Sequence, residues 1–447
     1  MNRGRARAVQ SVFTVIAPVR SDRVGDVERV LAEVSADVEG NRHLPLARLG
    51  GLHFASLVLF PASRGFPPTL VFESNVDATI ADHLADLVAA AGPGVDAIWG
   101  GCTDYPAGGS GDPAAVRHWL RSRVVLPGAY HIGATGRSRE QITAEASLQE
   151  VLERFLDEQQ AAASLPEASA EVRAALQARV RDDPSLAEVA RPAPAEGRRD
   201  RLRRLLHLAG SADSGVLVPV GALLVVLVAL ARRRPLAAVA VVAAGPAWLR
   251  WREISDPAVD HAVDPAALTA IEAVEDQPGV MQNHLASLTE VKPGVARSTL
   301  LRSILWVINV GARTKYTKGE LGGIPSIHFA HWSVIDGGRR LLFLSNYGGS
   351  WESYLDDFIE KAASGLSAVW SHTVDFPASR WLGLQSGGAR NGPAFKRVAR
   401  RSQVATTVHY RAYPERSVAN INDTSALVAD LFTDLDGDEV QRWLLRF

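Results

Sequence analysis

Three histidines and one arginine in the last third of the sequence are the residues best suited to acid–base chemistry or to ligation of a cofactor, namely His331, His372, His409 and Arg380. An imidazole changes charge near neutral pH and is a common metal ligand. Alternation along one expected strand places His328 and His331 on opposite faces, so these two would not chelate one metal ion. Each of the three is therefore a separate candidate for a catalytic group or ligand. The alternative for each is a structural histidine.

The stretch SNYGGSWESYLDDF, residues 345–358, is the most distinctive in the chain. Two glycines turn the backbone after an expected strand, and the serine that follows them can cap a helix. One interpretation is that Asn346, Tyr347, Trp351 and Glu352 form the rim of a ligand pocket. The other is a well-capped amphipathic helix, in which the helix dipole favours Glu352 in the first turn.

Stronger catalytic and metal-binding motifs are absent from the sequence. It contains no Walker loop and no HExxH, CxxC or GxSxG pattern. Cys102 is the single cysteine, so an intrachain disulfide and a site built from several thiolates are both excluded. The sequence therefore leaves the identity of any metal open.

The candidate residues lie in the second of two copies of a long internal repeat. Short matching segments recur in the same order in both halves of the chain. Asn75 and Asn346 each stand the same number of residues before a tryptophan, and a proline follows each tryptophan at the same distance. A series of matches in register indicates duplication rather than chance. His331, which has Ser56 as its counterpart, belongs to the second copy alone.

Each copy predicts the element order βαββαβ. In the first copy the elements are expected at 13–18, 22–38, 53–60, 69–73, 79–91 and 124–132. In the second copy they are expected at 284–291, 296–310, 328–335, 340–345, 350–363 and 404–413. This order is the split-βαβ, or ferredoxin-like, motif, in which both helices pack on one face of an antiparallel sheet. The other face of each sheet needs cover, so two copies that face each other predict an α+β fold of the barrel type.

The segment between the copies is expected to contact a membrane. Two apolar runs, 216–231 and 236–249, are separated by three arginines and a proline. Each run is shorter than the roughly 20 residues that cross a bilayer as a helix, so we expect a short hairpin that is shallowly inserted or spans with snorkelling arginines. Trp248 and Trp251 are typical of a membrane-interface anchor. The alternative is a soluble hairpin buried in the protein.

These segments divide the chain into three parts. A first ferredoxin-like unit is expected at 1–158, a helical linker with the membrane hairpin at 159–260, and a second unit at 261–447. Basic residues that flank the hairpin favour a position of both units on the cytoplasmic face of the membrane. The chain carries 48 basic and 49 acidic residues, and this balance argues against nucleic acid as a partner. The expected partner is the lipid bilayer, contacted through 216–249.

A duplicated ferredoxin-like unit resembles the dimeric α+β barrel superfamily, which includes the dye-decolorising peroxidases and the chlorite dismutase-like haem proteins. The segment SNYGGSWESYLDDF is also similar to that of uncharacterised, membrane-associated bacterial proteins of this type. The resemblance implies that the second copy holds a haem through a histidine, with His331, His372 or His409 as the axial ligand. The GxxDG motif of the dye-decolorising peroxidases does not occur in this chain.

Two functional hypotheses follow. The first is a membrane-associated, peroxidase-like oxidoreductase that binds haem or another small ligand in the second copy. The second is a non-enzymatic module that binds a lipid or another ligand and is held at the membrane by its hairpin. A structural assembly role, including homo-oligomer formation, is a further alternative because ferredoxin-like sheets pair easily. The sequence does not decide whether the chain is an enzyme.

Overall fold

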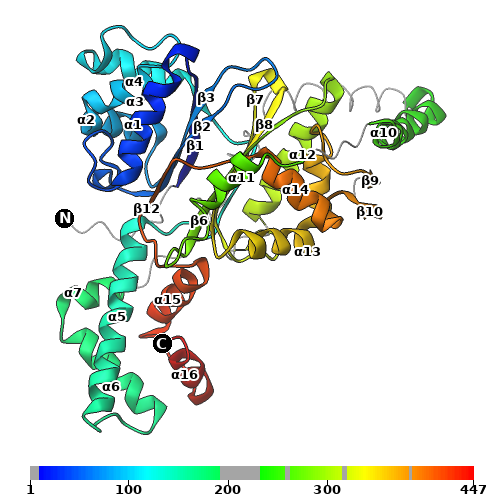
Figure 1. Ribbon diagram of the computed structural model, residues 1–447. Coiled ribbons are helices and arrows are strands. Elements are labelled where there is room, and N and C mark those ends of the chain that lie inside the picture. The colour runs from blue at the N-terminus through cyan, green and yellow to red at the C-terminus, as the bar shows by residue number, and fades with distance from the viewer. Residues whose placement is uncertain (1–9, 192–231, 257–261, 315–319, 382–384) are drawn as a thin grey trace.

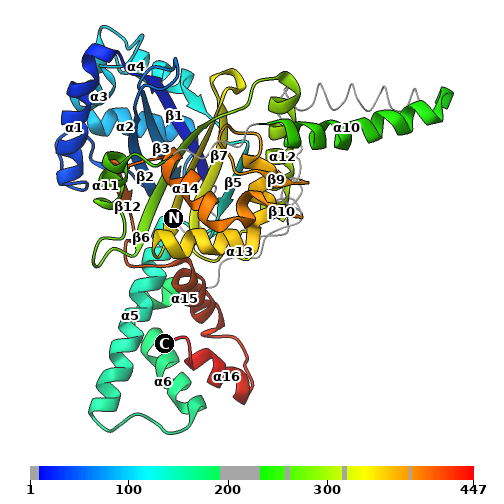
Figure 2. The same cartoon turned by 45° about the vertical axis from the view of Figure 1, so that its right-hand side comes forward.

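The computed structural model describes residues 10–191, 232–256, 262–314, 320–381 and 385–447. They form an α+β architecture with two antiparallel five-stranded sheets (Figure 1). Helices cover the outer face of each sheet, and a separate group of helices projects from one end of the body (Figures 1 and 2).

The first half of the chain supplies four strands of the first sheet and one strand of the second. Its elements are β1 (Ser11–Pro18), α1 (Val24–Ala36), β2 (Leu52–Phe60), β3 (Thr69–Val76), α2 (Ile80–Ala91), α3 (Pro93–Trp99), α4 (Pro113–Ser122), β4 (Val124–Val125) and β5 (Ala129–Ile132). α1 buries Val27, Leu31 and Val34, which recur at helical spacing and therefore form one apolar face against the sheet.

The second half repeats this arrangement. Its elements are α11 (Pro265–Glu272), β6 (Gln282–Glu290), α12 (Val295–Thr314), β7 (Ile327–Ile335), β8 (Arg340–Gly348), α13 (Trp351–Trp370), β9 (Ser379–Arg380), β10 (Ser386–Gly387), α14 (Gly392–Ser402), β11 (Gln403–Val404) and β12 (Val408–Arg411). Ser350 caps α13 by accepting a hydrogen bond from the Ser353 amide, as its position after the two glycines predicts. The strand order is β12-β2-β3-β1-β4 in the first sheet and β11-β6-β8-β7-β5 in the second.

The closing strands of the two halves are exchanged between the sheets. We expected one closing strand in each half, at 124–132 and 404–413, but each of these segments is broken into two short strands. β4 pairs with β1 of its own sheet, whereas β5 crosses over and pairs with β7. In the same way β11 pairs with β6, and β12 crosses over to pair with β2. Each sheet is thus completed by a strand from the other half of the chain.

The space between the two sheets is filled by side chains in layers. One end is apolar, where Val58 and Val71 of the first sheet pack with Leu342 of the second. The other end is aromatic, and the rings of Phe54 and Phe329 meet there with centroids 5.7 Å apart. Polar side chains, among them Ser56 and Glu73, lie between these two layers.

A helical bundle is built from the segments that follow the two closing strands. It consists of α5 (Arg139–Ala161), α6 (Ser169–Arg181), α7 (Pro184–Val189), α15 (Val418–Asp430) and α16 (Gly437–Leu444). Leu152, Leu176, Leu427 and Trp443 are buried in its core. The two halves of the chain therefore also pack against each other in this bundle. The predicted domain boundary between 158 and 159 falls inside α5.

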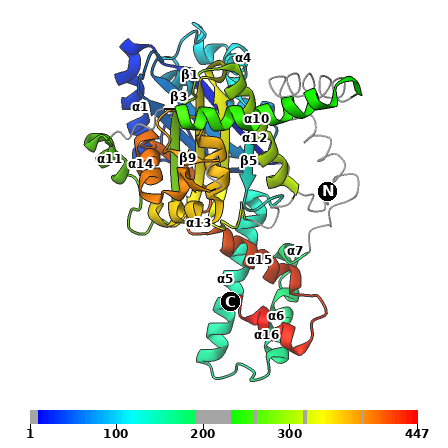
Figure 3. The same ribbon diagram turned by 90° about the vertical axis from the view of Figure 1, so that its right-hand side faces the viewer.

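α10 (Pro235–Ser255) extends away from the body beside the helices of the second sheet (Figures 2 and 3). It contains the apolar run 236–249 and has Pro246 inside the helix. No helix in the described ranges combines the length and the apolar character that a membrane crossing requires. The other predicted arm of the hairpin, 216–231, lies outside the described residues. The apolar hairpin predicted from the sequence is therefore not confirmed.

Candidate functional site

A carboxylate lies at the centre of the polar layer between the sheets. Glu73 on β3 is completely buried. Its oxygens accept hydrogen bonds from Asn75 Nδ2 at 3.1 Å and from Ser56 Oγ at 3.1 Å, both within the first sheet. Asn346 Nδ2 of the second sheet lies 3.2 Å from each of the two oxygens. Strand alternation points all four side chains into the space between the sheets.

Two histidines of the second sheet approach this carboxylate. His284 Nε2 lies 2.9 Å from Glu73 Oε2, and His284 Nδ1 hydrogen-bonds with the Thr406 hydroxyl at 2.7 Å. His331 Nδ1 lies 3.5 Å from Glu73 Oε1. Neither ring nitrogen of His331 has a hydrogen-bond partner within the described part of the chain, although the side chain is fully buried. His331 is therefore the least satisfied polar group of the cluster.

His409 completes the cluster from the exchanged strand β12. Its Nε2 hydrogen-bonds with Asn346 Oδ1 at 2.9 Å. Its ring centroid lies 5.3 Å from that of His284. The strand exchange thus brings a residue from near the end of the chain onto the first sheet, where it reaches the Glu73 cluster, the group formed by Glu73, His284, His331, Asn346 and His409.

The pKa shifts in the Glu73 cluster give the carboxylate and the imidazoles different charge states. Burial alone would raise the pKa of Glu73, but hydrogen bonding and charge from His284 outweigh it and lower this pKa to about 2. Burial lowers the pKa of His331, opposed in part by the Glu73 charge. Burial, followed by the charge on His284, lowers the pKa of His409 well below its usual value. At neutral pH Glu73 is thus ionised, and His331 and His409 are neutral imidazoles.

His53 and His328, the histidines matched by the repeat, sit at equivalent irregularities of the two sheets. The register shifts between Leu52 and Phe54 on β2, and again between Ile327 and Phe329 on β7. His53 lies 2.9 Å from Asp77 and hydrogen-bonds with the hydroxyl of Tyr413 at 2.8 Å. Burial, followed by the charge on His53, lowers the pKa of His328 to about 3. These two histidines close the aromatic end of the interior.

The other two predicted catalytic residues lie away from the Glu73 cluster. His372 follows α13, is fully buried, and has no hydrogen bond at either ring nitrogen within the described residues. Burial, followed by the charges of Arg297 and Lys292, lowers its pKa to about 3. Arg380 lies in the two-residue strand β9 and is exposed. His331 and His409 are therefore brought together, whereas His372 and Arg380 are not.

The four predicted ligand-binding residues are also separated. Asn346 points into the Glu73 cluster, but Tyr347 packs against α13, where its ring stacks on Tyr354 at 3.9 Å between centroids. Trp351 is buried beneath the guanidinium of Arg400, 3.6 Å from its ring centroid. Glu352 is exposed and forms an ion pair with Lys396. Tyr347, Trp351 and Glu352 thus belong to the packing and surface of a well-capped helix.

Sequence reasoning missed Glu73 and His284, the two residues that form the centre of the site. Both stand at inward positions of strands, and alternation around them could have placed them on the hidden face. All candidate residues predicted from the sequence lie in the second copy, whereas Glu73 lies in the first. Its carboxylate becomes part of the site only because the second sheet covers it.

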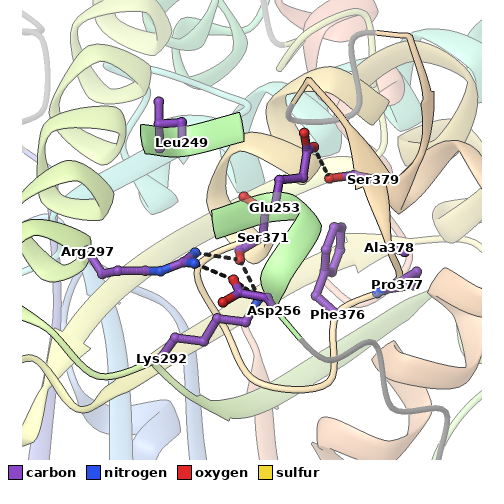
Figure 4. Close-up of a pocket in the computed structure, with 10 residues that line it drawn as sticks. All are labelled: Leu249, Glu253, Asp256, Lys292, Arg297, Ser371, Phe376, Pro377, Ala378 and Ser379. Atoms are coloured by element: carbon purple, nitrogen blue, oxygen red, sulfur yellow. Dashed lines mark hydrogen bonds and ion pairs between the residues drawn. The ribbon is translucent and has the colours of Figure 1, made fainter. Parts of the chain in front are cut away.

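A pocket that is open to solvent on one side lies at the C-terminal end of α10, the foot of this helix (Figure 4). Lys292 Nζ lies 3.0 Å from Asp256 Oδ2, and Arg297 contacts the same oxygen. Glu253 accepts hydrogen bonds at 2.6 Å from the Ser379 hydroxyl and from the Trp381 amide. The carboxylate of Glu253 in α10 and that of Asp256 at its C-cap thus hold the helix against the second half of the protein.

A second pocket has a mainly apolar lining. It lies between the outer face of the second sheet and the helices α13 and α14. Its aromatic lining includes Phe343, Tyr354, Trp370 and Phe395. Both pockets are formed by the second half of the chain.

The sequence resemblance predicts a haem held by His331, His372 or His409. An axial histidine needs open space beside the ring for the porphyrin. None of His331, His372 and His409 lines either pocket. In the described ranges, no group of three or more His, Cys, Asp or Glu side chains is arranged to hold a metal ion. Haem binding stays a prediction of the sequence resemblance.

Comparison with known proteins assigns no family to this chain. No family model matches it, and neither the curated proteins nor the solved structures contain a match.

Proposed function

We propose that the chain is a membrane-associated ligand-binding module. Its body would be two ferredoxin-like βαββαβ units that form an α+β barrel, distantly related to the dimeric α+β barrel superfamily. The equivalent element order of the two halves and the two facing antiparallel sheets support this assignment. The exchange of β5 and β12 supports it further, because each sheet is incomplete without the other half.

The single observation that carries membrane association is the exposed apolar surface of α10. Leu236 is 85% exposed, Trp251 is 58% exposed and Ile254 is 67% exposed. Arg250 and Arg252 lie on the same turns as the tryptophan and isoleucine. Apolar and aromatic side chains that stand beside arginines are typical of a helix at a membrane interface.

The lipid-facing segment would be 216–249, with both folded units on the cytoplasmic face of the membrane. The run 216–231 contributes through its sequence, which is rich in Val, Leu and Ala. The arginines on both flanks support the cytoplasmic assignment, because positive residues are retained on that side. Flotation with phosphatidylcholine vesicles tests the proposal, since polar substitutions on the exposed face of α10 should release the protein.

A second candidate function, a small-ligand oxidoreductase, is favoured by one observation in the Glu73 cluster. His331 is a buried, neutral imidazole without a hydrogen bond in the described structure, next to an ionised carboxylate. Functional sites are enriched in such costly groups. The test is an absorption spectrum with metal analysis of the purified protein. If neither a Soret band after haem loading nor a stoichiometric transition metal is found, this candidate fails in its haem and metal forms.

A further inference from the structure

Three cations converge on one carboxylate beside the pocket at the foot of α10. Lys292, Arg297 and Arg252 all approach the single carboxylate of Asp256, and Arg252 lies 3.5 Å from its Oδ1. The other carboxylate of the pocket, Glu253, forms its own ion pair with an arginine of α10 at 2.7 Å. The charge of Asp256 therefore compensates only part of the positive charge around it.

These cations are built into the pocket rather than spread over a surface. The side chain of Arg297 is 6% exposed, and that of Lys292 is 14% exposed. Both cations also donate to one backbone oxygen, that of Ser371, at 3.0 Å from Lys292 Nζ and 3.3 Å from Arg297 Nη1. A buried cation is costly without a partner, and its attraction for an anion is screened less than at a surface.

Asp256 Oδ2 marks a position that an oxygen of a bound anion can take. Lys292 Nζ and an Nη of Arg297 both contact this one atom. A phosphate group presents several oxygens, so one could occupy this position while another faces the open side of the pocket. Arginine and lysine are the side chains that recognise phosphate by charge-assisted hydrogen bonds.

We propose that this pocket is a binding site for a phosphate-bearing anion, held by Lys292 and Arg297, which displaces the Asp256 carboxylate. The proposal deepens the function proposed above, on which it rests, by naming the ligand class. Displaced Asp256 keeps Arg252 as a partner, so the exchange leaves no carboxylate unpaired. Trp251 and Trp381 are both partly exposed near the pocket, and Arg250 lies over the Trp381 ring. An anionic lipid headgroup would meet these aromatic side chains, and a soluble phosphate would not need them.

Asp256 is the C-cap of α10, so the anion would also act on the helix. The ion pairs from Asp256 to Lys292 and Arg297 hold the last turn of α10 to the body. If an external anion displaces the Asp256 carboxylate, these two ion pairs are lost, while Glu253 keeps its hydrogen bonds to Ser379 and Trp381. Anion binding is thereby coupled to the position of the apolar helix.

The test uses the full-length protein in non-ionic detergent, titrated with inorganic phosphate by calorimetry. Lys292→Gln and Arg297→Gln should each weaken phosphate binding about tenfold, since a hydrogen bond to a charged group is worth about that factor. Asp256→Asn should strengthen binding, because it removes the competing carboxylate. Lys361→Gln is the matched control, since Lys361 pairs with Asp357 on the surface of α13 and should change nothing.

A gain of affinity in Asp256→Asn is a result that a merely structural role would not produce, even if the cation variants fold poorly.

A second arm compares vesicles of phosphatidylcholine with vesicles that also contain phosphatidic acid. Tighter binding to phosphatidic acid, lost in Arg297→Gln, identifies a lipid headgroup as the source, whereas calorimetric binding without this lipid effect identifies a soluble phosphate. The proposal is overturned if wild type binds neither phosphate nor phosphatidic acid, or if Asp256→Asn binds more weakly than wild type. Binding to pure phosphatidylcholine tests the membrane association separately, so the two failures are distinguishable.

Discussion

Glu73 of the first sheet lies 2.9 Å from His284 of the second, and neither side chain reaches solvent. This pair joins the two halves of the chain across their common interior. The relationship is asymmetric, because Leu344 stands two residues before Asn346 where Glu73 stands two residues before Asn75. The second sheet therefore has an apolar residue at this position. The carboxylate of the first sheet interacts with the histidines that face it from the second sheet.

Removal of the Glu73 charge should destabilise the protein strongly. In Glu73→Gln the amide cannot pair with His284 as a carboxylate does, and the loss of one partner from a buried pair costs about 3 kcal/mol in free energy of unfolding. Urea unfolding measures this loss. Glu352→Gln, on an exposed side chain, is the control and should change stability by about 0.5 kcal/mol or less. Equal unfolding midpoints for the two variants would contradict the central role of Glu73.

Stability should fall as the pH drops from about 6.5 to about 4. Burial lowers the pKa of His83 and of His131 to about 4. Between pH 6.5 and pH 4 both side chains therefore stay neutral in the folded protein, whereas in the unfolded chain they bind a proton. Their contribution is complete above pH 6.5 and is lost as the pH approaches 4, with an upper limit of about 3 kcal/mol for each group. Glu73 extends the loss, because its lowered pKa stabilises the fold above about 4.5 and this contribution disappears toward pH 2.

The measurement is urea unfolding over a series of pH values. His83→Gln retains a group that can hydrogen-bond to Ser74 but cannot titrate, so the dependence on pH should become shallower. A free energy of unfolding that stays constant between pH 6.5 and pH 4 would contradict the burial of neutral histidines.

The two halves should not fold independently. A fragment of residues 1–191 would lack β12 from the first sheet and would leave Glu73 without the second sheet, and a fragment of 262–447 would lack β5. We expect each fragment alone to show no cooperative thermal transition, and the two together to associate and regain one. Circular dichroism of the separate and mixed fragments checks this. A cooperative transition in either fragment alone would show that strand exchange is not required for folding.

The strands of both halves could be predicted from the sequence because alternation and the repeat are local signals. β2 and β7 begin and end within one residue of the expected bounds. The exchange of the closing strands could not be predicted, because it depends on pairing between distant segments rather than on periodicity. Pro127 and Gly128 mark the break in the first half, but Ala405, Thr406 and Thr407 at the second break carry no comparable signal.

The site was predicted in part for the same reason. His331 and His409 were recognised from their residue type, and Asn346 from its distinctive segment. Their common partner Glu73 lies in the other copy and meets them only through the packing of one sheet on the other. His372 was recognised equally well by its residue type, yet it lies beside Lys292 and Arg297 and not in the Glu73 cluster. This position could not be predicted, because strand and helix patterns do not indicate which face of a sheet a connecting segment approaches.

Flotation with phosphatidylcholine vesicles tests the proposed function most directly. Wild-type protein should rise with the vesicles, and the double variant Trp251→Glu, Ile254→Glu should stay in the dense fraction, because charged side chains on α10 oppose insertion into the interface. Leu126→Glu is the matched control, since Leu126 is 64% exposed on the first half of the chain, and this variant should float like wild type. Wild-type protein that stays in the dense fraction, or a double variant that floats as well as wild type, would contradict membrane association through α10.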